Sequence, residues 1–343
     1  MKIVFFETPH EDKEVLADLL GKNLPGNDIT FFEEKLTLEK ADSIADAECI
    51  SVFINSIISK GVIDKLPKLK LITTRSTGYD HIDVTYANSK GISVASVPSY
   101  GSRTVAEFAF ALILALSRKI FPAYHHLREE DSFDLSNLMG FDLYGKTIGV
   151  IGTGKIGKNA IKIAKGFDMN VIAYDLFPDT TFAAQAGYTY VDLNTLLSTS
   201  DIITIHAPYT KDTHHLINMS NISLVKKGAL LVNTARGEIV ETEALVWALN
   251  QNILAGVGLD VLEGERFMKE EMSLLAESAT GKMQTKEDFK TLLESHTLIH
   301  DRRVIATPHM AFCSKEAVGE ILKTTVDTIA GFVSGTPVNV IKK

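Results

Sequence analysis

The chain has 343 residues, of which 45% are hydrophobic and 23% charged, the balance of an ordinary globular protein. Its formal net charge of -8 argues against nucleic acid or an anionic membrane as a general partner, because both require a basic surface. At roughly 150 residues per domain, the length predicts about two domains.

Cysteine content and hydropathy indicate the compartment. Cys49 and Cys313 are too few for a disulfide framework and too far apart for a metal-ligand spacing, so we expect free thiols in a reducing environment. The N-terminal strand pattern meets charge at Glu7 and lacks the apolar core of a signal peptide. The longest apolar stretch, 108–116, is too short to span a bilayer. These features predict a cytoplasmic protein.

Short β-branched runs alternate with segments of helical periodicity along the chain. The first series of expected strands comprises 2–6, 49–54, 70–74 and 92–96. The second comprises 147–152, 170–175, 201–206, 228–234, 254–260 and 303–309. Such alternation predicts an α/β fold with doubly wound parallel sheets and helices on both faces.

Two helical segments bear on the domain organisation. The segment 103–120 is apolar on nearly every side, which predicts a buried helix, and it lies where one strand series ends and the next begins. The segment 315–333 is expected to pack back onto the first domain. The predicted domains are a substrate domain formed by 1–100 plus 311–343 and a nucleotide-binding domain formed by 101–310.

The hexamer GTGKIG follows a hydrophobic strand and opens a helical segment, as the G-x-G-x-x-G motif of dinucleotide-binding folds does. Gly152 would allow the tight turn, Gly154 the approach of a pyrophosphate, and Gly157 the close packing of helix on strand. The free N–H groups and dipole at the helix N-terminus attract phosphates. The expected cofactor-binding residues of this loop are Gly152, Thr153, Gly154, Lys155, Ile156 and Gly157.

Asp175 ends the next predicted strand, where an acid can accept hydrogen bonds from the adenosine ribose. It would repel the 2′-phosphate of NADP, and no arginine immediately follows it, so the pattern favours NAD. The alternative is a structural glycine turn beside a surface aspartate.

Arg236, Glu265 and His309 each follow the carboxyl end of a predicted strand, where ligands bind in open α/β sheets. An arginine can grip a carboxylate and polarise a carbonyl, and a histidine can pass a proton near neutral pH. A carboxylate beside that histidine stabilises the imidazolium. With a nicotinamide as hydride source, the set indicates interconversion of a 2-keto acid and a 2-hydroxy acid. Taken singly, each residue could equally be a strand-end cap or a solvated charge.

Seven stretches, in order along most of the chain, carry a family resemblance. They are RSTGYDHID (75–83), VPSYGSRTVAEF (97–108), IGTGKIGK (151–158), HAPYT (206–210), NTARGEIV (233–240), GLDVLEGE (258–265) and TPHMAF (307–312). On these motifs the chain resembles the D-isomer-specific 2-hydroxyacid dehydrogenase family, and most of all its D-lactate dehydrogenase branch.

The resemblance implies a role for each matched residue. Arg236 would bind the substrate carboxylate and carbonyl, His309 would be the acid/base, and Glu265 would be its carboxylate partner. Asp260 would lie near the nicotinamide amide. The implied substrate-binding residues are Thr77, Gly78, Tyr79 and Tyr100. The further implied cofactor-binding residues are His206, Pro208, Thr234, Ala235 and Asp260.

The resemblance also implies two flavodoxin/Rossmann-like domains with the active site in the cleft between them. The family is usually dimeric through the region around 103–140. Glu263 competes with Glu265, but the family's interval from Asp260 selects Glu265 and leaves Glu263 as an ordinary exposed acid.

Two pairs of histidines raise the question of a metal site. Further ligands at suitable spacing are not apparent near them, so no metal is expected and we interpret them as surface or loop residues. The pairs are His125 with His126 and His214 with His215.

One departure from the family concerns substrate size. His309 lies 44 residues after Glu265, longer than the family's usual interval. The extra stretch, 266–300, is expected to be helical in two pieces and to be either a lid over the pocket or a surface excursion. A branched or aromatic 2-keto acid is therefore an alternative to pyruvate. A second alternative is an NAD-sensing corepressor of the same fold that binds peptide motifs.

Overall fold

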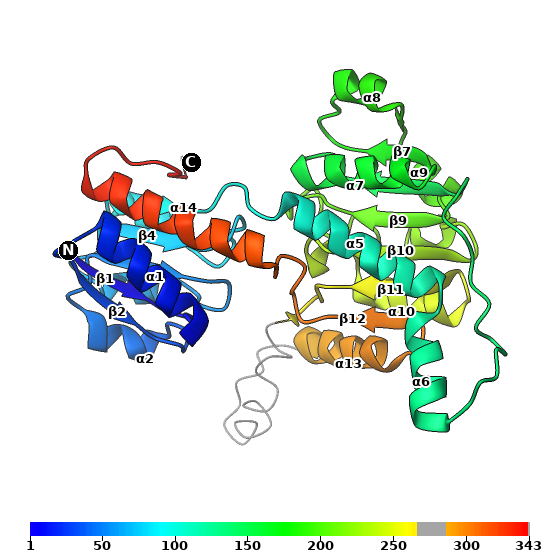
Figure 1. Cartoon of the computed structure of the whole chain (residues 1–343), viewed down its shortest axis with the longest axis horizontal. Coiled ribbons are helices and arrows are strands. Elements are labelled where there is room, and N and C mark those ends of the chain that lie inside the picture. The colour runs from blue at the N-terminus through cyan, green and yellow to red at the C-terminus, as the bar shows by residue number, and fades with distance from the viewer. Residues whose placement is uncertain (266–285, 342–343) are drawn as a thin grey trace. The chain divides into compact units, whose positions relative to one another are not determined.

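The computed structural model describes residues 1–265 and 286–341. The chain divides into two compact units, one formed by Met1–Gly101 and Cys313–Lys343 and the other by Ser102–Phe312. Each unit is built around a parallel β-sheet with helices on its faces (Figure 1). The predicted α/β class with parallel sheets is confirmed.

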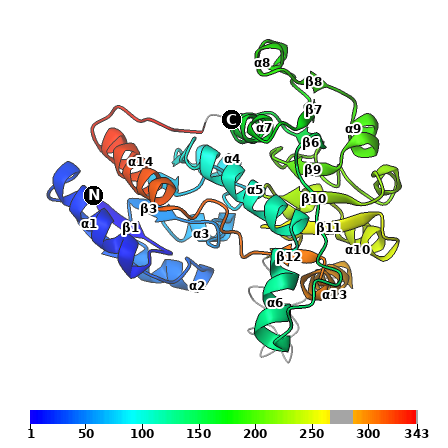
Figure 2. The same cartoon turned by 45° about the vertical axis from the view of Figure 1, so that its right-hand side comes forward.

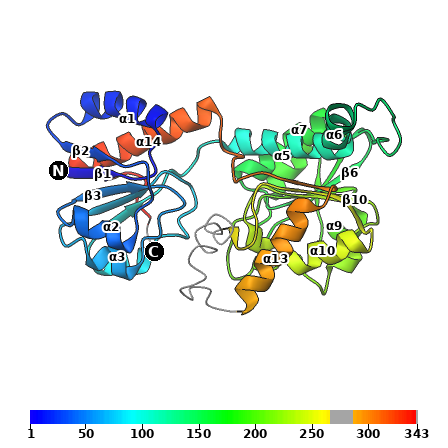
Figure 3. The same ribbon diagram turned by 90° about the horizontal axis from the view of Figure 1, so that it is seen from below.

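The first unit contains a sheet with the strand order β2-β1-β3-β4-β5. Its strands are β1 (Lys2–Phe5), β2 (Asp28–Phe31), β3 (Cys49–Val52), β4 (Leu71–Thr74) and β5 (Ser93–Ala95). Helices α1 (His10–Asn23) and α14 (Lys315–Val333) lie side by side on one face, and α2 (Leu38–Ala41) and α3 (Lys60–Asp64) cover the other (Figure 3). Helix α4 (Val84–Ser89) precedes β5.

Helix α14 belongs to this unit although it is formed by the last part of the chain. Its Leu322 and Ile329 side chains are fully or almost fully buried in the same core cluster as Leu16 and Leu20 of α1. Burial of each such side chain stabilises the fold by roughly 1.5–3 kcal/mol. The C-terminal segment is therefore an integral layer of the first unit.

The second unit contains a sheet with the strand order β12-β11-β10-β9-β6-β7-β8. Its strands are β6 (Thr147–Ile151), β7 (Asn170–Tyr174), β8 (Thr189–Tyr190), β9 (Ile202–Ile205), β10 (Ala229–Asn233), β11 (Leu254–Leu259) and β12 (Val304–Ala306). Helices α5 (Ser102–Ser117) and α7 (Lys155–Gly166) cover one face. Helices α9 (Leu193–Thr199), α10 (Thr242–Asn250) and α13 (Lys286–His300) cover the other (Figure 3). Helix α8 (Thr180–Ala186) lies at the β8 edge (Figure 2).

The strand order reverses at β6, which lies between β9 and β7. The connection from β6 leads to one side of the sheet and the later strands fill the other side. Because all strands are parallel, their carboxyl ends lie along one edge, and the reversal opens a crevice for ligands there. The glycine-rich hexamer begins directly after β6.

Helix α5 packs on the sheet over a stretch of β11 that has little side-chain bulk. A Cβ added at Gly258 would lie 3.1 Å from Cβ of Leu112 and 3.4 Å from Cδ1 of Leu116. Gly256 likewise lies beneath Leu116. The small residues of β11 thus create the space into which the apolar face of α5 fits.

The structure corrects several details of the sequence prediction. The helix expected over 103–120 ends at Ser117, because Lys119 adopts a left-handed conformation with φ 55°, and α6 (Ile120–Glu130) begins after it. Strands β2 and β8 were not among the predicted strands. Within 266–300, the second helical piece is observed as α13, whereas residues 266–285 lie outside the described part of the chain. In that described part, no helix is both long and apolar enough to cross a membrane.

Candidate active site

The loop after β6 is built by close contacts that only glycine allows. Gly152 has φ +88°, and a Cβ there would lie 2.4 Å from the backbone nitrogen of Ala207. A Cβ on Gly157 would lie 2.0 Å from the carbonyl oxygen of Gly152. By contrast, nothing lies within 4 Å of a Cβ built on Gly154. Gly157 therefore lets the helix approach the loop after β6, Gly152 lets that loop lie against Ala207, and Gly154 borders open space.

Helix α7 begins at this open space. Its N-cap is Gly154, which offers no side chain to cap the helix, and Lys155 and Ile156 occupy its first turn. The first backbone N–H groups of a helix have no intrahelical partner, and they carry the positive end of the dipole. This helix end is suited to bind a phosphate.

The Asp175 side chain lies at the end of β7 and is joined to the same loop. Its Oδ2 accepts hydrogen bonds from the Thr153 backbone nitrogen at 2.6 Å and from Thr153 Oγ1 at 2.7 Å. Its Oδ1 accepts one from the Phe177 backbone nitrogen at 2.9 Å. The carboxylate is thus held at the position where dinucleotide-binding folds contact the ribose.

Two buried polar atoms follow β9 and β10. His206 and Thr234 are each 8% exposed, and within the described residues neither His206 Nδ1 nor Thr234 Oγ1 has a hydrogen-bond partner. Burial lowers the pKa of His206 to about 4, so its ring is neutral at physiological pH. Buried polar atoms normally have partners, so these two are candidates to bind polar groups of a ligand. Pro208 and Ala235 follow them along the two loops.

Together these features fit a nicotinamide dinucleotide. The open α7 N-terminus at Gly154 would hold the pyrophosphate and Asp175 the adenosine ribose. The unpartnered atoms of His206 and Thr234 lie further along the same edge of the sheet.

His309 and Glu265 form a hydrogen-bonded pair beyond the ends of β12 and β11. His309 Nδ1 lies 3.0 Å from Glu265 Oε2 and 3.2 Å from Oε1. Both side chains are mostly buried, with 20% and 23% of their surfaces exposed. The carboxylate holds a proton on Nδ1, which leaves Nε2 as the nitrogen that can exchange a proton with a substrate.

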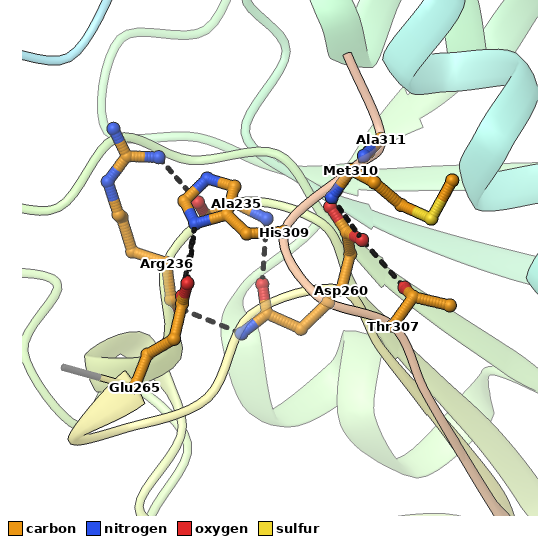
Figure 4. A network of polar contacts seen from close by, with 9 residues as sticks. Ala235, Arg236, Asp260, Glu265, Thr307, His309, Met310 and Ala311 are labelled. Carbon is orange, nitrogen blue, oxygen red and sulfur yellow. Dashed lines mark hydrogen bonds and ion pairs between the residues drawn. The ribbon is translucent and has the colours of Figure 1, made fainter. Parts of the chain in front are cut away.

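Asp260 fixes the turn that carries His309 (Figure 4). Its Oδ1 accepts from Thr307 Oγ1 at 2.6 Å and the Met310 backbone nitrogen at 2.9 Å, and its Oδ2 accepts from the Ala311 nitrogen at 2.8 Å. These bonds enclose His309, whose own φ is a strained +55°. Burial raises the pKa of Asp260, while the hydrogen bonds and His309 oppose that shift. Asp260 therefore acts on the histidine turn directly.

Arg236 follows β10 and lies in the same group of side chains (Figure 4). The buried Asn233 closes its loop, because its amide donates to the Arg236 carbonyl at 2.8 Å and its Oδ1 accepts from the Ala235 nitrogen at 3.0 Å. The next residue, Gly237, touches the turn before Glu265, since a Cβ there would lie 2.1 Å from the Leu262 carbonyl carbon. The arginine loop and the glutamate turn are thus in backbone contact.

Glu263 was expected to be an ordinary exposed acid, and this expectation is wrong. Its side chain is 16% exposed, and Oε1 lies 2.6 Å from His215 Nε2. Its Oε2 accepts from Thr242 Oγ1 at 2.7 Å and from the Thr242 nitrogen at 3.1 Å. A residue so connected ties the Glu265 turn to the start of α10 and to the loop after β9. Neighbouring Glu238 has a raised pKa, caused by burial first and then by the charge of Glu263.

The other paired histidines form local contacts. His125 Nδ1 lies 2.8 Å from Glu129, and His126 lies 3.9 Å from Glu130, each one helical turn away in α6. His214 stacks on His215 with ring centroids 3.9 Å apart. Across residues 1–265 and 286–341, no group of three or more His, Cys, Asp or Glu side chains is arranged as a metal site.

The substrate-binding candidates of the first unit follow β4 and β5. Thr77 Oγ1 donates to the Val97 carbonyl at 2.8 Å, and the Gly78 carbonyl accepts from Ser76 Oγ at 2.6 Å. Tyr79 and Tyr100 are half-buried. The structure places Thr77, Gly78 and Tyr79 in one loop and Tyr100 after β5, all within the first unit.

Arg75 was not singled out by the sequence interpretation, although it supports this loop. It is 2% exposed, and its guanidinium donates to the carbonyls of Phe6 and Glu7, beyond the end of β1, and to that of Ser51 in β3. Burial lowers its pKa to about 10, so it remains charged. An arginine directly after a buried strand was the one available signal.

Comparison with known proteins agrees with this geometry. Residues 110–311 match the model of the D-isomer specific 2-hydroxyacid dehydrogenase, NAD binding domain. D-lactate dehydrogenase of Escherichia coli is 34% identical over 337 residues, 98% of each chain. The structure of D-lactate dehydrogenase from Aquifex aeolicus, complexed with NAD and lactic acid, matches with a TM-score of 0.83 and 34% identity, covering 97% of this chain and 96% of that one. The structure of D-2-hydroxyisocaproate dehydrogenase matches with a TM-score of 0.82 and 28% identity over the full length of both.

The chain therefore belongs to the D-isomer-specific 2-hydroxyacid dehydrogenase family, as its motifs predicted. It is an oxidoreductase with NAD as its cofactor, and the predicted cofactor is confirmed.

Proposed function

We propose that the protein reduces pyruvate or a closely related 2-keto acid to the D-2-hydroxy acid with NADH. The observation that carries the proposal is the pair of His309 and Glu265 at 3.0 Å, placed beside Arg236 beyond the sheet of the NAD-binding unit. NADH, when bound, supplies the hydride.

In this mechanism His309 donates a proton from Nε2 to the carbonyl oxygen of the substrate. Glu265 stabilises the charged imidazole before transfer and keeps its orientation afterwards. Arg236 binds the substrate carboxylate with two parallel hydrogen bonds and polarises the carbonyl, which concentrates positive charge where negative charge develops. Asp260 keeps His309 in place through the turn that it encloses.

The first unit contributes substrate recognition in this proposal. Backbone N–H groups around Thr77, Gly78 and Tyr79 bind the carboxylate, and Tyr100 lines the space for the substrate side chain. Arg75, two residues before Thr77, anchors the start of this segment to the carbonyls of Phe6 and Glu7.

Pyruvate is the preferred candidate because the aligned relative from Escherichia coli and the Aquifex aeolicus structure are both named D-lactate dehydrogenase. A larger branched 2-keto acid is the second candidate, because D-2-hydroxyisocaproate dehydrogenase has the same fold over its whole length. Relative kcat/KM values for pyruvate, 2-ketobutyrate and a branched 2-keto acid decide between them. A highest value for the branched acid would replace pyruvate in the proposal.

A homodimer is proposed as the working form. Helix α6 exposes an apolar row of side chains formed by Ile120, Phe121, Tyr124 and Leu127, each between 47% and 54% exposed. An exposed apolar patch of this kind is typical of an interaction surface. Sedimentation of the wild type and of Leu127→Lys tests this; a dimer that becomes a monomer supports it, and a monomeric wild type contradicts it.

The cytoplasm is the proposed location, where NADH is available and an exposed thiol such as Cys313 stays reduced. The corepressor alternative predicts NADH binding without turnover. Absence of NADH oxidation with every 2-keto acid tested would favour it.

A further inference from the structure

The carboxylate of Asp175 is the end of a chain of hydroxyl groups. Tyr188 and Tyr190 have their hydroxyl oxygens 2.9 Å apart, and the Tyr190 hydroxyl lies 2.8 Å from Thr153 Oγ1. Thr153 Oγ1 in turn donates to Asp175 Oδ2 at 2.7 Å. The chain connects the edge strand β8 to the glycine-rich loop and to the ribose-binding acid.

The direction of each hydrogen bond follows from proton counting. Each hydroxyl has one proton, and a carboxylate can only accept. Thr153 donates its proton to Asp175, so the bond between Thr153 and Tyr190 requires Tyr190 to donate. The Tyr190 proton is then used, so Tyr188 donates to Tyr190. Burial raises the pKa of Tyr188, which keeps its proton in place as the first donor.

The Tyr190 hydroxyl is also fixed from another side. It accepts a hydrogen bond from the Asp179 backbone nitrogen at 3.0 Å. The Tyr188 ring lies edge-on to the Tyr190 ring, with centroids 5.3 Å apart, and also contacts Phe182. The donor to Thr153 is therefore held by packing as well as by hydrogen bonds.

The bonds to Asp175 determine which of its lone pairs a ribose can use. A carboxylate has about four acceptor positions, two on each oxygen. Within the described residues, Thr153 fills both positions of Oδ2, and the Phe177 nitrogen fills one of Oδ1. One position on Oδ1 stays open, so its orientation decides how well a ribose hydroxyl is bound.

We propose that Tyr190 is a specificity-determining positioning residue for the cofactor. Its hydroxyl donates to Thr153 Oγ1, so that the Thr153 hydroxyl donates to Asp175 and keeps the carboxylate oriented toward the adenosine ribose. Hydrogen bonds in such a chain polarise one another, so the donor from Tyr190 strengthens the bond to Asp175. Without it, the Thr153 hydroxyl can turn away and the carboxylate can rotate. The preference for NADH over NADPH then falls, because the carboxylate repels a 2′-phosphate most strongly when it is fixed beside the ribose.

The test is the dissociation constants of NADH and NADPH for the purified full chain, measured by fluorescence titration without substrate. Tyr190→Phe removes one hydrogen bond and keeps the ring, so the NADH constant should rise about 3- to 10-fold. The dissociation constant of NADPH should change less. The ratio of the NADPH to the NADH dissociation constant, called the NADPH/NADH ratio below, should therefore fall. Tyr188→Phe removes a bond one step further from the carboxylate and should lower the ratio less.

Tyr86→Phe is a matched control, because its hydroxyl also donates to a carboxylate, that of Asp64, but in the first unit. It should leave both constants unchanged. An unchanged NADPH/NADH ratio in Tyr190→Phe overturns the proposal, whether neither dissociation constant changes or both rise equally. These outcomes concern binding alone and are independent of which 2-keto acid the protein reduces.

Thr153 provides a second route should Tyr190→Phe fail to fold. Thr153→Ser keeps the hydroxyl and should keep the ratio, whereas Thr153→Val removes it and should lower the ratio. Where all variants fold, combining Thr153→Val with Tyr190→Phe should lower the ratio no further than Thr153→Val alone, because the two act through one bond. Equal ratios in Thr153→Ser and Thr153→Val contradict the proposal.

Discussion

His309 and Glu265 lie 44 residues apart in the chain, yet His309 Nδ1 is 3.0 Å from Glu265 Oε2. The contact forms because β11 and β12 are parallel neighbours, so the segments after them leave the same edge of the sheet. Asp260, at the end of β11, reinforces it by accepting hydrogen bonds from Thr307, Met310 and Ala311.

Replacement of His309 tests its role as the acid. His309→Gln keeps a polar side chain of similar size but cannot transfer a proton at neutral pH. Turnover should fall about 10²- to 10⁴-fold, whereas the dissociation constant of NADH should stay close to that of the wild type. Stopped-flow reduction and NADH titration measure the two effects. Turnover within twofold of the wild type would remove His309 from the mechanism.

Alanine substitutions at two glycines of the hexamer should affect different properties, NADH binding at Gly154 and apo stability at Gly157. Gly154→Ala places a Cβ where nothing lies within 4 Å, at a negative φ of −66°, so apo stability should change little. NADH binding should weaken at least about tenfold, because the methyl group occupies the pyrophosphate position. Gly157→Ala forces a Cβ to 2.0 Å from the Gly152 carbonyl and should lower apo stability itself.

Thermal unfolding without cofactor and NADH titration separate these outcomes. Gly166→Ala is the control, since it lies at the end of the same helix with nothing within 4 Å of its Cβ. Normal NADH binding by Gly154→Ala would show that the pyrophosphate binds elsewhere.

The sequence predicted the parts of this site that depend on spacing and strand order. The strand preceding GTGKIG and the acid at Asp175 follow from a hydrophobic run, a glycine pattern and an interval along the chain. Arg236, Glu265 and His309 could be grouped because parallel strands bring their carboxyl ends to one edge.

Features that depend on the packing of particular side chains could not be predicted. Nothing in the sequence distinguishes Glu263 from an exposed acid. Only the fold brings His215 and Thr242 to it. Tyr190 forms part of a strand of two residues, too short to produce a period-two pattern. The apolar helix segment ends near Lys119, which has a left-handed conformation. No glycine stands at this position to signal such a conformation in the sequence.

Glu263 is expected to position Glu265 and Arg236, two of the proposed catalytic residues. Glu263→Ala leaves the His215 ring, the Thr242 hydroxyl and the Thr242 nitrogen without their acceptor, and an unsatisfied buried group costs about 1–3 kcal/mol. The free energy of unfolding should fall by about that amount. kcat should fall with little change in NADH affinity, because the Glu265 turn and the Arg236 loop meet beside Glu263.

Glu263→Gln keeps an acceptor for Thr242. Its free energy of unfolding and its kcat should therefore lie between those of Glu263→Ala and the wild type. Glu243→Ala removes a neighbouring carboxylate that pairs with Lys290 at the surface, and it should change neither quantity noticeably. Denaturant unfolding and steady-state kinetics give the comparison. Full kcat in Glu263→Ala would contradict the positioning role.

The stability of the protein without cofactor should depend on His206 below neutral pH. An unfolded histidine has a pKa near 6.5, whereas burial lowers that of His206 to about 4 in the folded chain. As the pH falls below 6.5, the unfolded state takes up this proton first, so the folded state loses stability until the pH reaches about 4. At pH 5 the loss from this group is on the order of 2 kcal/mol.

His206→Gln removes the side chain that takes up this proton. The free energy of unfolding of the variant should therefore decrease less than that of the wild type between pH 7.5 and pH 5. Urea unfolding of both proteins at the two pH values measures the difference. Parallel losses in the two proteins would mean that His206 is not buried as a neutral ring.

NADH oxidation with pyruvate, 2-ketobutyrate, phenylpyruvate and oxaloacetate, together with the configuration of the product, tests the proposed reaction. We expect that NADH oxidation requires a 2-keto acid, yields the D-2-hydroxy acid, and has its highest kcat/KM with pyruvate or a close homologue. Failure of the purified chain to oxidise NADH with any of the four acids, or formation of the L-product, would contradict the proposed reaction.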